Sequence, residues 1–370
     1  MKDNKKLTTL LITICILSII SCTSKKDSVI KTLSKDFPKS IELKGEVFNI
    51  SSDSLDDCEK MKIVNNYLMI LSSTTDKLVT AININDFRVY RLIDKGRGPN
   101  EFINQRFCDS DNAFVISQDF SFRDNSIRYG TIIVPQDTPV FKEYRLKIKD
   151  TLTYGAEVIL SHNHAVYFPF TNRGEYQYMT NRVAIFNEEG DLLKTMGDMT
   201  SLVIPGEREK EVRFRNFSGN YAKTPNSNNF AFASKTGTYI EFYDYDKQST
   251  LHRIYGYSKY DISYNENGAI LSTSVSADCE VGFIDITASE TTYYALYMGV
   301  QRSELKNLSV QKLDYKGSDI YTYSKEGKPL KHLHLDREVR KIAASPDGKY
   351  LYGWSNNPET YEVEIVRYSL

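Results

Sequence analysis

Short apolar segments separated by turn residues recur along most of this chain, and they constrain its fold more than any other feature. From about residue 41 onwards, alternating or apolar runs end at glycine, proline, asparagine or aspartate. Segments 67–71, 78–82 and 87–92 follow one another closely, and similar groups continue to the C-terminus. Hardly any 3.6-residue periodicity lies between them, and 26 Tyr and 18 Phe against one Trp favour strands over helices. The sequence therefore predicts an all-β protein.

The segments fall into six groups of roughly 54 residues, close to the size of a four-stranded propeller blade with long loops. Each group has one nearly all-apolar segment suited to an inner strand and a charged, alternating one suited to an outer strand. Blades stacked around an axis bury both faces of each sheet without long open edges. We predict a six-bladed β-propeller over residues 41–370, in which an N-terminal strand at 43–50 closes the last blade, built by 337–370. Two β-sandwiches are the alternative, but they need a linker that we cannot locate.

The N-terminus has the pattern of a bacterial lipoprotein signal peptide. Three lysines among the first six residues precede an apolar run at 7–20, and Ser21 is the small residue that signal peptidases need beside the cleaved bond. The run is too short for a membrane-spanning helix, which needs about 20 residues. We predict removal of residues 1–21 and lipidation, with palmitate-type acyl chains, of Cys22. An uncleaved anchor and an ordinary signal peptide with a chance cysteine are the alternatives.

Residues 22–40 are polar and charged, which suits a flexible tether between Cys22 and the folded body. More than one acyl chain, at about 0.8 kcal/mol per buried methylene, gives stable membrane anchoring. We expect a lipid-anchored protein of the cell envelope, at the outer membrane, with the membrane as one partner. With 47 basic and 48 acidic residues, the chain lacks the basic excess of a nucleic-acid-binding protein, and we expect no nucleic-acid partner.

The cysteines of the body are Cys58, Cys108 and Cys279. They are widely spaced, odd in number and without a C-x-x-C pair for zinc or thiol exchange. We expect mostly buried, unreactive thiols, and the sequence leaves one optional disulfide open.

Residues 96–102, GRGPNEF, form the most distinctive motif of the body. Two glycines around Arg97 permit backbone conformations closed to other residues, and Pro99 sets the exit direction of the chain. Glu101 then projects from a rigid loop. Two roles are open: a blade-to-blade connector in which Arg97 and Glu101 pair with neighbouring blades, or a ligand-facing loop that also includes Arg106.

This motif resembles the G-x-G-P-x-E-F signature of six-bladed β-propeller lipoproteins found in Bacteroides and its relatives. Residues 283–299 are similar to the Y-x-Y-A-L-Y-x-G stretch of the TolB-like branch of that group, and residues 327–370 resemble the ending of that branch. Asn100 stands where glycine is common, and Gln301 where arginine is frequent. The resemblance covers residues 41–370 and implies an architecture and a location, but no established chemistry.

Histidines offer two places where a metal site could start. His162 and His164, and likewise His332 and His334, lie two residues apart, which places both members of a pair on one side of a strand. No third ligand is tied to either pair by spacing, and outward-facing strand residues explain them equally well. The chain also lacks a G-x-S-x-G nucleophile motif and a phosphate-binding glycine loop. We predict no catalytic residue, no metal and no cofactor.

Arg213 and Arg215 alternate with phenylalanine in the densest basic and aromatic patch of the chain. At the mouth of a propeller, such side chains suit an acidic or sugar-containing ligand; in an ordinary strand, the phenyl rings simply point inward. The candidate ligand-binding residues are therefore Arg97, Glu101, Arg106, Arg213 and Arg215.

The predicted function is a non-catalytic binding or scaffold module for a protein, peptide or glycan. The alternative is an envelope hydrolase or lyase with its site in the central channel, because propellers also host enzymes. Three or more His, Asp, Glu or Arg side chains around one cavity favour the enzyme, and a broad aromatic and polar rim favours binding. Asp278, Glu280 and Asp285 lie close in sequence, but the sequence does not determine whether they converge at the axis.

Overall fold

The computed structural model of the chain describes most residues from 37 onwards. The described ranges are 37–48, 50, 55, 57–103, 105–111, 113–118, 126–135, 138–147, 149, 155–161, 164–169, 181–187, 189–198, 219–247, 249–254, 260–264, 270–305 and 315–370. Within them, the backbone alone is described at 105, 106, 108, 118, 155–161, 164–169, 181, 198, 252–254, 260–264 and 270–274.

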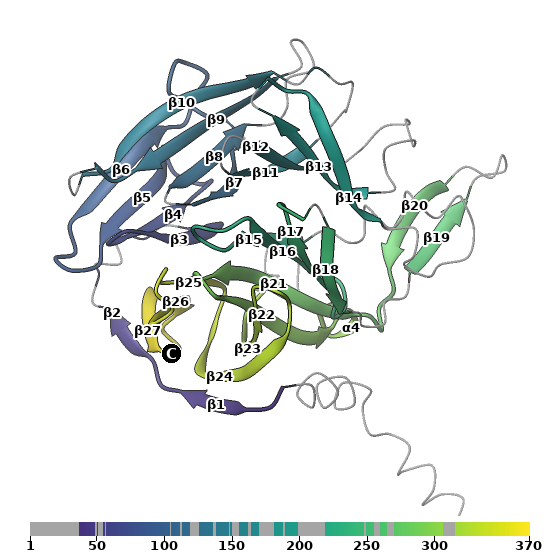
Figure 1. Ribbon diagram of the computed structural model, residues 1–370. Helices are drawn as coiled ribbons and strands as arrows, with labels where there is room; N and C mark the ends of the chain where they lie inside the picture. Colours follow the sequence, from purple (N-terminus) through teal and green to yellow (C-terminus); the bar gives the residue numbers. More distant parts are fainter. Residues whose placement is uncertain are drawn as a thin grey trace, which may run out of the picture.

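The chain folds as an all-β propeller in which the first strands of successive sheets meet near a common centre (Figure 1). The prediction of an all-β protein is thus confirmed. Among the described residues the only helix is the single turn α4 (Arg302–Leu305). The first sheet is an antiparallel meander of β3 (Lys60–Val64), β4 (Tyr67–Leu71), β5 (Lys77–Asn83) and β6 (Val89–Asp94).

An eight-stranded sheet follows, and it consists of two antiparallel meanders. The first contains β7 (Gln105–Ser110), β8 (Phe114–Gln118), β9 (Ser126–Ile133) and β10 (Val140–Lys147). The second contains β11 (Gly155–Ser161), β12 (His164–Pro169), β13 (Asn181–Asn187) and β14 (Leu192–Asp198). The parallel pair β7–β11 joins the two meanders.

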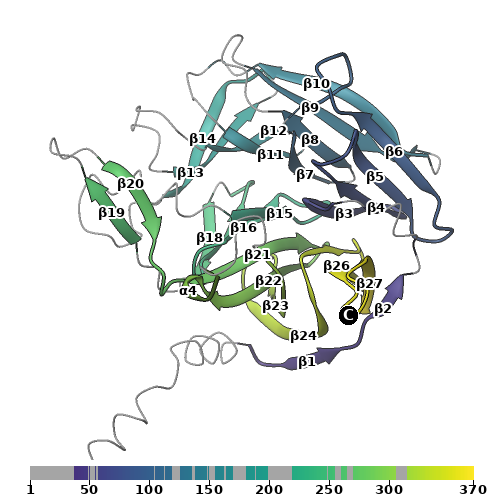
Figure 2. The same cartoon turned by 180° about the vertical axis from the view of Figure 1, so that it is seen from behind.

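Two sheets of different size come next in the sequence. The four-stranded one contains β15 (Gly219–Lys223), β16 (Asn229–Ser234), β17 (Ile240–Asp244) and β18 (Ser249–Ile254). The two-stranded one, β19 (Tyr260–Tyr264) with β20 (Ile270–Val275), projects from the side of the ring (Figure 2).

The last two sheets each take up one strand from the N-terminal part of the chain. One sheet contains β21 (Glu280–Ala288), β22 (Thr292–Gln301), β23 (Gly317–Ser324) and β24 (Pro329–Val339), with β1 (Ser40–Leu43) parallel to β24. The other contains β25 (Lys341–Ala344), β26 (Tyr350–Asn356) and β27 (Val363–Ser369), with β2 (Glu46–Phe48) antiparallel to β27.

The N-terminal segment differs from the single strand expected at 43–50, because Gly45 divides it between two sheets. A Cβ atom on Gly45 would lie 2.3 Å from Val366 Cγ1, so a larger residue does not fit this crossing. The backbone N–H of Gly45 also donates to Asp336 Oδ2 at 3.1 Å. The chain therefore attaches first to β24 and then to β27, where Phe48 lies opposite Ile365.

The nearly all-apolar segment of the first sheet is its second strand, not its innermost one as expected. β4 is buried along its whole length because its side chains pack into an apolar cluster on each face of the sheet, while β3 and β5 pair with its two edges. The innermost strand, β3, instead carries Lys60 and Lys62, since its free edge faces the first strands of other sheets. Polar residues on the innermost strands form the site described below.

Apolar clusters fill the space between neighbouring sheets. The largest aromatic one lies between the β15–β18 sheet and the β21–β24 sheet and includes Phe242, Tyr293 and Tyr323. Phe37, at the start of the described chain, packs into it with ring centroids 5.0 Å from Tyr321 and 5.3 Å from Tyr323. We call these five residues the aromatic cluster. It ties the N-terminal segment to the body of the ring.

Candidate functional site

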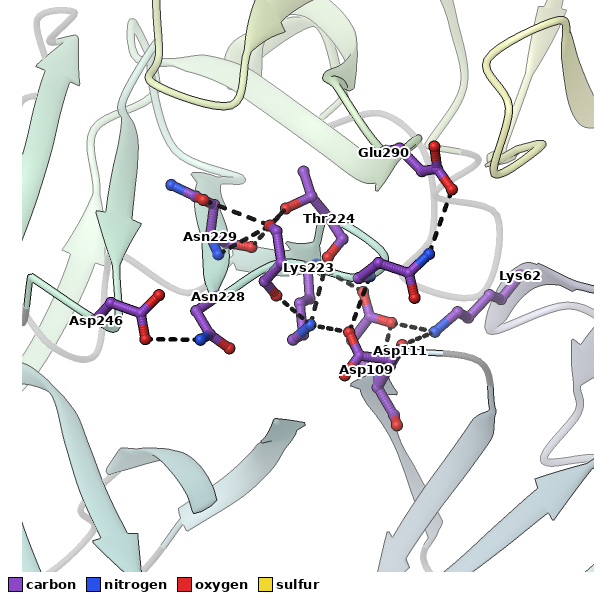
Figure 3. Close-up of polar contacts among 12 residues, drawn as sticks. Lys62, Asp109, Asp111, Lys223, Thr224, Asn228, Asn229, Asp246 and Glu290 are labelled. Carbon is purple, nitrogen blue, oxygen red and sulfur yellow. Dashed lines mark hydrogen bonds and ion pairs between the residues drawn. The ribbon is translucent and has the colours of Figure 1, made fainter. Parts of the chain in front are cut away.

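The candidate site lies where the innermost strands converge, and it consists of three lysine–aspartate pairs. Strand β3 supplies two lysines, β7 and the turn after it two aspartates, β15 a lysine, and β21 an aspartate. Figure 3 shows two of the pairs at the end of β7. We call the six residues the axial cluster: Lys60, Lys62, Asp109, Asp111, Lys223 and Asp285.

Lys62 joins the first sheet to the second. Its Nζ donates to Asp109 Oδ1 at 2.6 Å and to the carbonyl of Ser110. The side chains of Lys62 and Asp109 are only 13% and 9% exposed. The second oxygen, Asp109 Oδ2, accepts the backbone N–H of Lys223 at 2.7 Å. Asp109 therefore holds three innermost strands together: β3, β7 and β15.

Lys223 is the most deeply buried cation of the cluster. Its side chain is 1% exposed, and Nζ donates to Asp111 Oδ1 and to the carbonyl of Ser227. Burial lowers the pKa of Lys223, while Asp111 and Asp109 oppose this shift. The same Asp111 oxygen accepts the backbone N–H of Asn226 at 3.2 Å.

Lys60 and Asp285 form the third pair, between the first sheet and β21. Lys60 Nζ donates to Asp285 Oδ1 and, at 2.7 Å, to the carbonyl of Ile286. Asp285 is fully buried, and its Oδ2 accepts the backbone N–H of Ile342 in β25 at 2.9 Å. Of the three neighbouring carboxylates, Asp285 alone belongs to the cluster, because Glu280 instead accepts the Tyr297 hydroxyl at 2.6 Å.

A small cavity opens beside the cluster. It has about 350 Å³ of space when the solvent at its mouth is included, but its centre is only wide enough for a water-sized group. Lys60, Lys62, Lys223, Asp109 and Phe107 form part of its wall. The Phe107 ring lies 5.6 Å from Lys60 Nζ, within the range of a cation–π contact.

The rim beside this cavity is polar. Asn226 has a left-handed backbone with φ of 55°, which asparagine tolerates better than most residues. Its Nδ2 donates to Glu290 Oε1 at 3.3 Å (Figure 3). The backbone N–H of Glu290 in turn donates to the carbonyl of Pro346 at 2.9 Å. Turns from three sheets thus meet at the rim.

The axial cluster joins innermost strands through carboxylates that already accept hydrogen bonds. A general base needs an oxygen that can reach the substrate proton. Both oxygens of Asp109 and of Asp285 already accept a lysine or a backbone N–H, and both donors to Asp111 bind its Oδ1. Each carboxylate is matched by one ammonium group. In the described part of the chain, no group of three or more His, Cys, Asp or Glu residues has the geometry of a metal site.

The GRGPNEF motif lies in the loop between β6 and β7, and Glu101 folds back onto that loop. Glu101 Oε2 accepts the Gly98 N–H at 2.7 Å, and a Cβ atom on Gly96 would lie 2.0 Å from the same oxygen. Arg97 is exposed and has no hydrogen bond or ion pair with another described residue. Among the described residues, neither Arg97 nor Glu101 forms a hydrogen bond or ion pair with a neighbouring sheet, and the pairing expected of a blade-to-blade connector stays a prediction. A ligand-facing role for either residue stays a prediction.

Two residues that the sequence did not single out attach this loop to the next sheet. Arg128 in β9 donates to Glu143 in β10 at 2.7 and 2.6 Å and to the carbonyl of Gly98 at 3.1 Å. The hydrogen bonds from Arg128 lower the pKa of Glu143. Asn100, with φ of 60°, donates its N–H to Glu143 Oε2 at 3.0 Å. This conformation explains why asparagine can stand where glycine is common.

His332 and His334 share a partner that their spacing could not reveal. His332 Nε2 and His334 Nδ1 lie 2.8 and 3.0 Å from Asp319 Oδ1, because β23 pairs with β24. Burial raises the pKa of Asp319, but the hydrogen bonds from the two imidazoles outweigh it, so the net shift is downward. Ser40 Oγ in β1 lies 3.3 Å from His332 Nδ1.

Several predicted features lie outside the described residues. They include the signal peptide and tether up to residue 36, with Cys22, as well as Arg213, Arg215 and His162. The side chains of Arg106, Cys108, His164 and His252 are also outside the description.

Of the remaining cysteines, Cys58 and Cys279 are buried thiols, and burial raises the pKa of the Cys58 thiol. A helix long and apolar enough to span a membrane does not occur among the described residues.

The axial cluster had only a weak sequence signal. Lys60 and Lys62 alternate with apolar residues in KMKIV, directly before the all-apolar strand β4. Asp109 lies near the end of β7, and Asp111 follows the last residue of that strand. A charged residue inside an apolar strand indicates that a partner of opposite charge lies buried beside it, but local spacing does not identify that partner. Lys60 and Asp285 are separated by 225 positions.

Comparisons with known proteins give a family and several distant structural likenesses. No curated protein matches the chain. The WD40 repeats of RRP9 are 10% identical, with 88% of this chain and 100% of that chain covered and a TM-score of 0.44. The gluconolactonase XC5397 from Xanthomonas campestris is 11% identical, with 84% and 85% covered and a TM-score of 0.40. Likenesses at this level carry no argument about the chain.

The family match is broader and more specific than these likenesses. The family described as TolB-like 6-blade propeller-like matches residues 36–347, which is most of the chain. The matched range includes the GRGPNEF loop and every residue of the axial cluster. It also includes every described strand except β26 and β27. The chain therefore belongs to the TolB-like 6-blade propeller-like family.

Proposed function

We propose that this protein is a lipid-anchored lipoprotein of the cell envelope whose propeller is a non-catalytic binding or scaffold module for a protein, peptide or glycan. In this proposal, residues 1–21 are the signal peptide, residues 22–40 the lipidated cysteine and tether, and residues 41–370 the propeller. The membrane is reached through Cys22, at the outer membrane. The support for this location is the lysine-rich start, the short apolar run and the Ser21–Cys22 junction.

The proposed propeller has six blades, with β2 closing the last one. The family description supports this number, and so does counting the two four-stranded meanders of the eight-stranded sheet as separate blades. Closure is supported by the pairing of Glu46 with Arg367, where Arg367 Nη2 also donates to Glu46 Oε2 at 2.6 Å. Each blade then has one strand at the centre and one at the rim.

One observation carries the binding role: each of the three described carboxylates of the axial cluster is engaged by a lysine and a backbone N–H group. An enzyme with its site in the channel needs a carboxylate that is open to substrate. A binding module needs only a stable ring that presents loops and edges to a partner. The axial cluster provides that stability by holding the innermost strands together.

The lipid anchoring is tested by detergent partition of the full chain expressed in a bacterium that processes lipoproteins. The wild-type protein should enter the Triton X-114 phase and gain the mass of its acyl chains, whereas Cys22→Ser should stay in the aqueous phase. Equal partition of the two proteins would overturn the anchoring proposal.

The binding role is tested with the Cys22→Ser protein and with polysaccharide and peptide fractions of the envelope. A binding module should be retained by one fraction while the mass distribution of that fraction stays constant over hours. Progressive shortening of the material, abolished by Asp109→Asn or Asp111→Asn in a protein that still melts cooperatively, would instead establish the hydrolase or lyase.

A further inference from the structure

We propose that the outer edge of β10 is a docking site for an extended acidic segment of a partner protein, which adds a strand to the sheet. The inference rests on the proposed binding role and names a partner class for it. It places the contact at the rim of the ring, on residues that the axial cluster does not use.

The first argument is the open edge of β10. This strand is the last in its sheet, and no described strand pairs with its outer side. It has eight residues and is longer than the outermost strands β6, β14 and β18, which have six, seven and six. Figures 1 and 2 both place it on the outer circumference of the ring. An edge of this length offers a row of N–H and C=O groups to an extended peptide.

The chain itself shows this mode of pairing elsewhere on its rim. β1 lies parallel to the outer edge of β24, and β2 lies antiparallel to the outer edge of β27. Both are short, extended segments that approach the sheets from outside. The rim of this ring therefore accepts added strands, and β10 has no such cover among the described residues.

The second argument is the positive charge that two lysines give to β10. Lys142 and Lys147 are exposed, and neither forms an ion pair with a described residue. Glu143, the one acidic residue of the strand, is already held by both nitrogens of the Arg128 fork. An added strand with carboxylates opposite the lysines would neutralise this charge.

The same lysines select against other strands. Lysine on an open edge discourages pairing with neutral or basic strands, which is a common protection against aggregation. An acidic segment converts this repulsion into attraction, so the edge stays closed to a second copy of β10 and open to an acidic partner.

The third argument is an exposed aromatic platform on the same strand. Tyr144 is 44% exposed and stacks on Tyr129 of β9 with ring centroids 5.4 Å apart and planes at 15°. The two residues lie directly opposite each other in the β9–β10 pair. The stack fixes the Tyr144 ring, and its outer face is available to a side chain of the added strand.

The test uses fluorescence anisotropy of a labelled eight-residue peptide with the Cys22→Ser protein. The peptide contains valine and threonine with two glutamates five positions apart, the spacing of Lys142 and Lys147. A second peptide has lysine in place of glutamate. A third keeps the glutamates but carries N-methyl groups on alternate backbone nitrogens, which removes the hydrogen bonds of strand addition and leaves the charge unchanged.

The glutamate peptide should bind, the lysine peptide should not, and the N-methylated peptide should bind at least ten-fold more weakly. The double variant Lys142→Glu, Lys147→Glu should lose at least ten-fold in affinity, and Tyr144→Ala about three- to ten-fold. The control pair Lys328→Glu, Lys331→Glu makes the same change of net charge at two other exposed lysines and should bind like the wild type.

Three outcomes would overturn the proposal. They are equal binding of the N-methylated peptide, which means charge attraction without strand addition; equal loss in the control pair; and absence of binding by the glutamate peptide. Retention by an envelope fraction in the earlier experiment, together with failure here, would leave the binding role standing and remove only this site. Loss of both would remove the binding role as well.

Discussion

The centre of the ring and the aromatic cluster between the β15–β18 and β21–β24 sheets are both buried, yet one is made of charges and the other of rings. At the centre, Lys60, Asp285 and their neighbours are mostly withdrawn from water. In the aromatic cluster, Phe242, Tyr293 and Tyr323 are fully buried. The two regions differ in which part of a sheet faces inward.

At the centre, the edges of strands face inward. An edge strand carries backbone N–H groups without a partner strand, and a buried one must find an acceptor. Asp109 and Asp285 accept such groups from Lys223 and Ile342. A buried carboxylate in turn needs a nearby cation, and the lysines supply it. The ion pairs are thus a consequence of converging strand edges.

Between the two sheets, flat faces meet instead of edges. The backbone groups of these strands are already paired within each sheet, so side chains need only fill space. Aromatic rings do this with large buried areas and tilted contacts, such as Phe242 against Tyr293 at 5.5 Å. Edges therefore select polar residues and faces select apolar ones, even at equal burial.

The largest effect is expected from Asp285→Ala at the centre. It leaves the buried ammonium of Lys60 and the N–H of Ile342 without their acceptor, and should cost about 4 kcal/mol in the free energy of unfolding. Urea denaturation measures this. The double variant Lys60→Met, Asp285→Asn keeps an acceptor for Ile342 and removes the charge, so it should recover most of the loss. A cost below about 1 kcal/mol for Asp285→Ala would contradict the role given to the pair.

Phe37→Ala tests the aromatic cluster and should have the next largest effect. It removes a ring packed on Tyr321 and Tyr323 and should cost about 3 kcal/mol, again by urea denaturation. Phe37→Leu keeps most of the buried volume and should cost about 1 kcal/mol. Equal effects of the two substitutions would mean that volume at this position does not matter.

A titratable group in each region should change the free energy of unfolding at alkaline pH, and the two changes should have opposite signs. Burial raises the pKa of Tyr321, so above pH 10 the unfolded chain loses a proton that the folded chain keeps, and stability falls. Tyr321→Phe should remove about 1.4 kcal/mol of that fall at pH 11 relative to pH 8. At pH 8 the variant should lie within about 0.5 kcal/mol of the wild type, since the buried Tyr321 hydroxyl has no hydrogen bond among the described residues.

Lys223 should respond in the opposite direction. Its pKa is lowered in the folded state, so the unfolded chain binds more protons as pH approaches 10.5, and the contribution of Lys223 to stability rises with pH. Lys223→Met should therefore steepen the alkaline loss of stability, whereas Tyr321→Phe makes it shallower. Parallel curves for the two variants would remove the distinction between the regions.

The smallest effect is expected at the partly exposed Arg128–Glu143 pair that holds the GRGPNEF loop. Glu143→Gln should cost about 1 kcal/mol at pH 7, less than the axial substitution because water already solvates part of the pair. Arg128 lowers the pKa of Glu143, so its contribution is present above pH 4.5 and disappears as pH falls through the folded pKa. The difference between wild type and variant should shrink accordingly in acid. A difference that is constant down to pH 2 would exclude this ion pair as its cause.

Much of the fold was accessible from local patterns. Segments such as 67–71 and 78–82 are strands because their residues suit half-buried or buried extended chain, and the turns between them contain residues that tolerate unusual backbone angles. The family resemblance of residues 96–102 also agreed with the match found for the chain. The motif lies in the loop between β6 and β7, whereas the sequence had left a connector role and a ligand-facing role both open.

The candidate site was not accessible in the same way. The motif points to Arg97 and Glu101, whereas the residues of the next sheet that hold this loop are Arg128 and Glu143. No motif of the sequence points to the lysines of β3. Their partners come from other sheets, and no regularity of spacing connects Lys62 to Asp109 or Lys60 to Asp285.

The sequence by itself determined that this chain forms short strands, because alternation and turn chemistry act between neighbours a few residues apart. The tertiary structure alone decided which strand edges meet at the centre, and hence which carboxylates receive a lysine and a backbone N–H. Those contacts depend on the closing of the ring, which brings Lys60 within hydrogen-bonding reach of a residue 225 positions away.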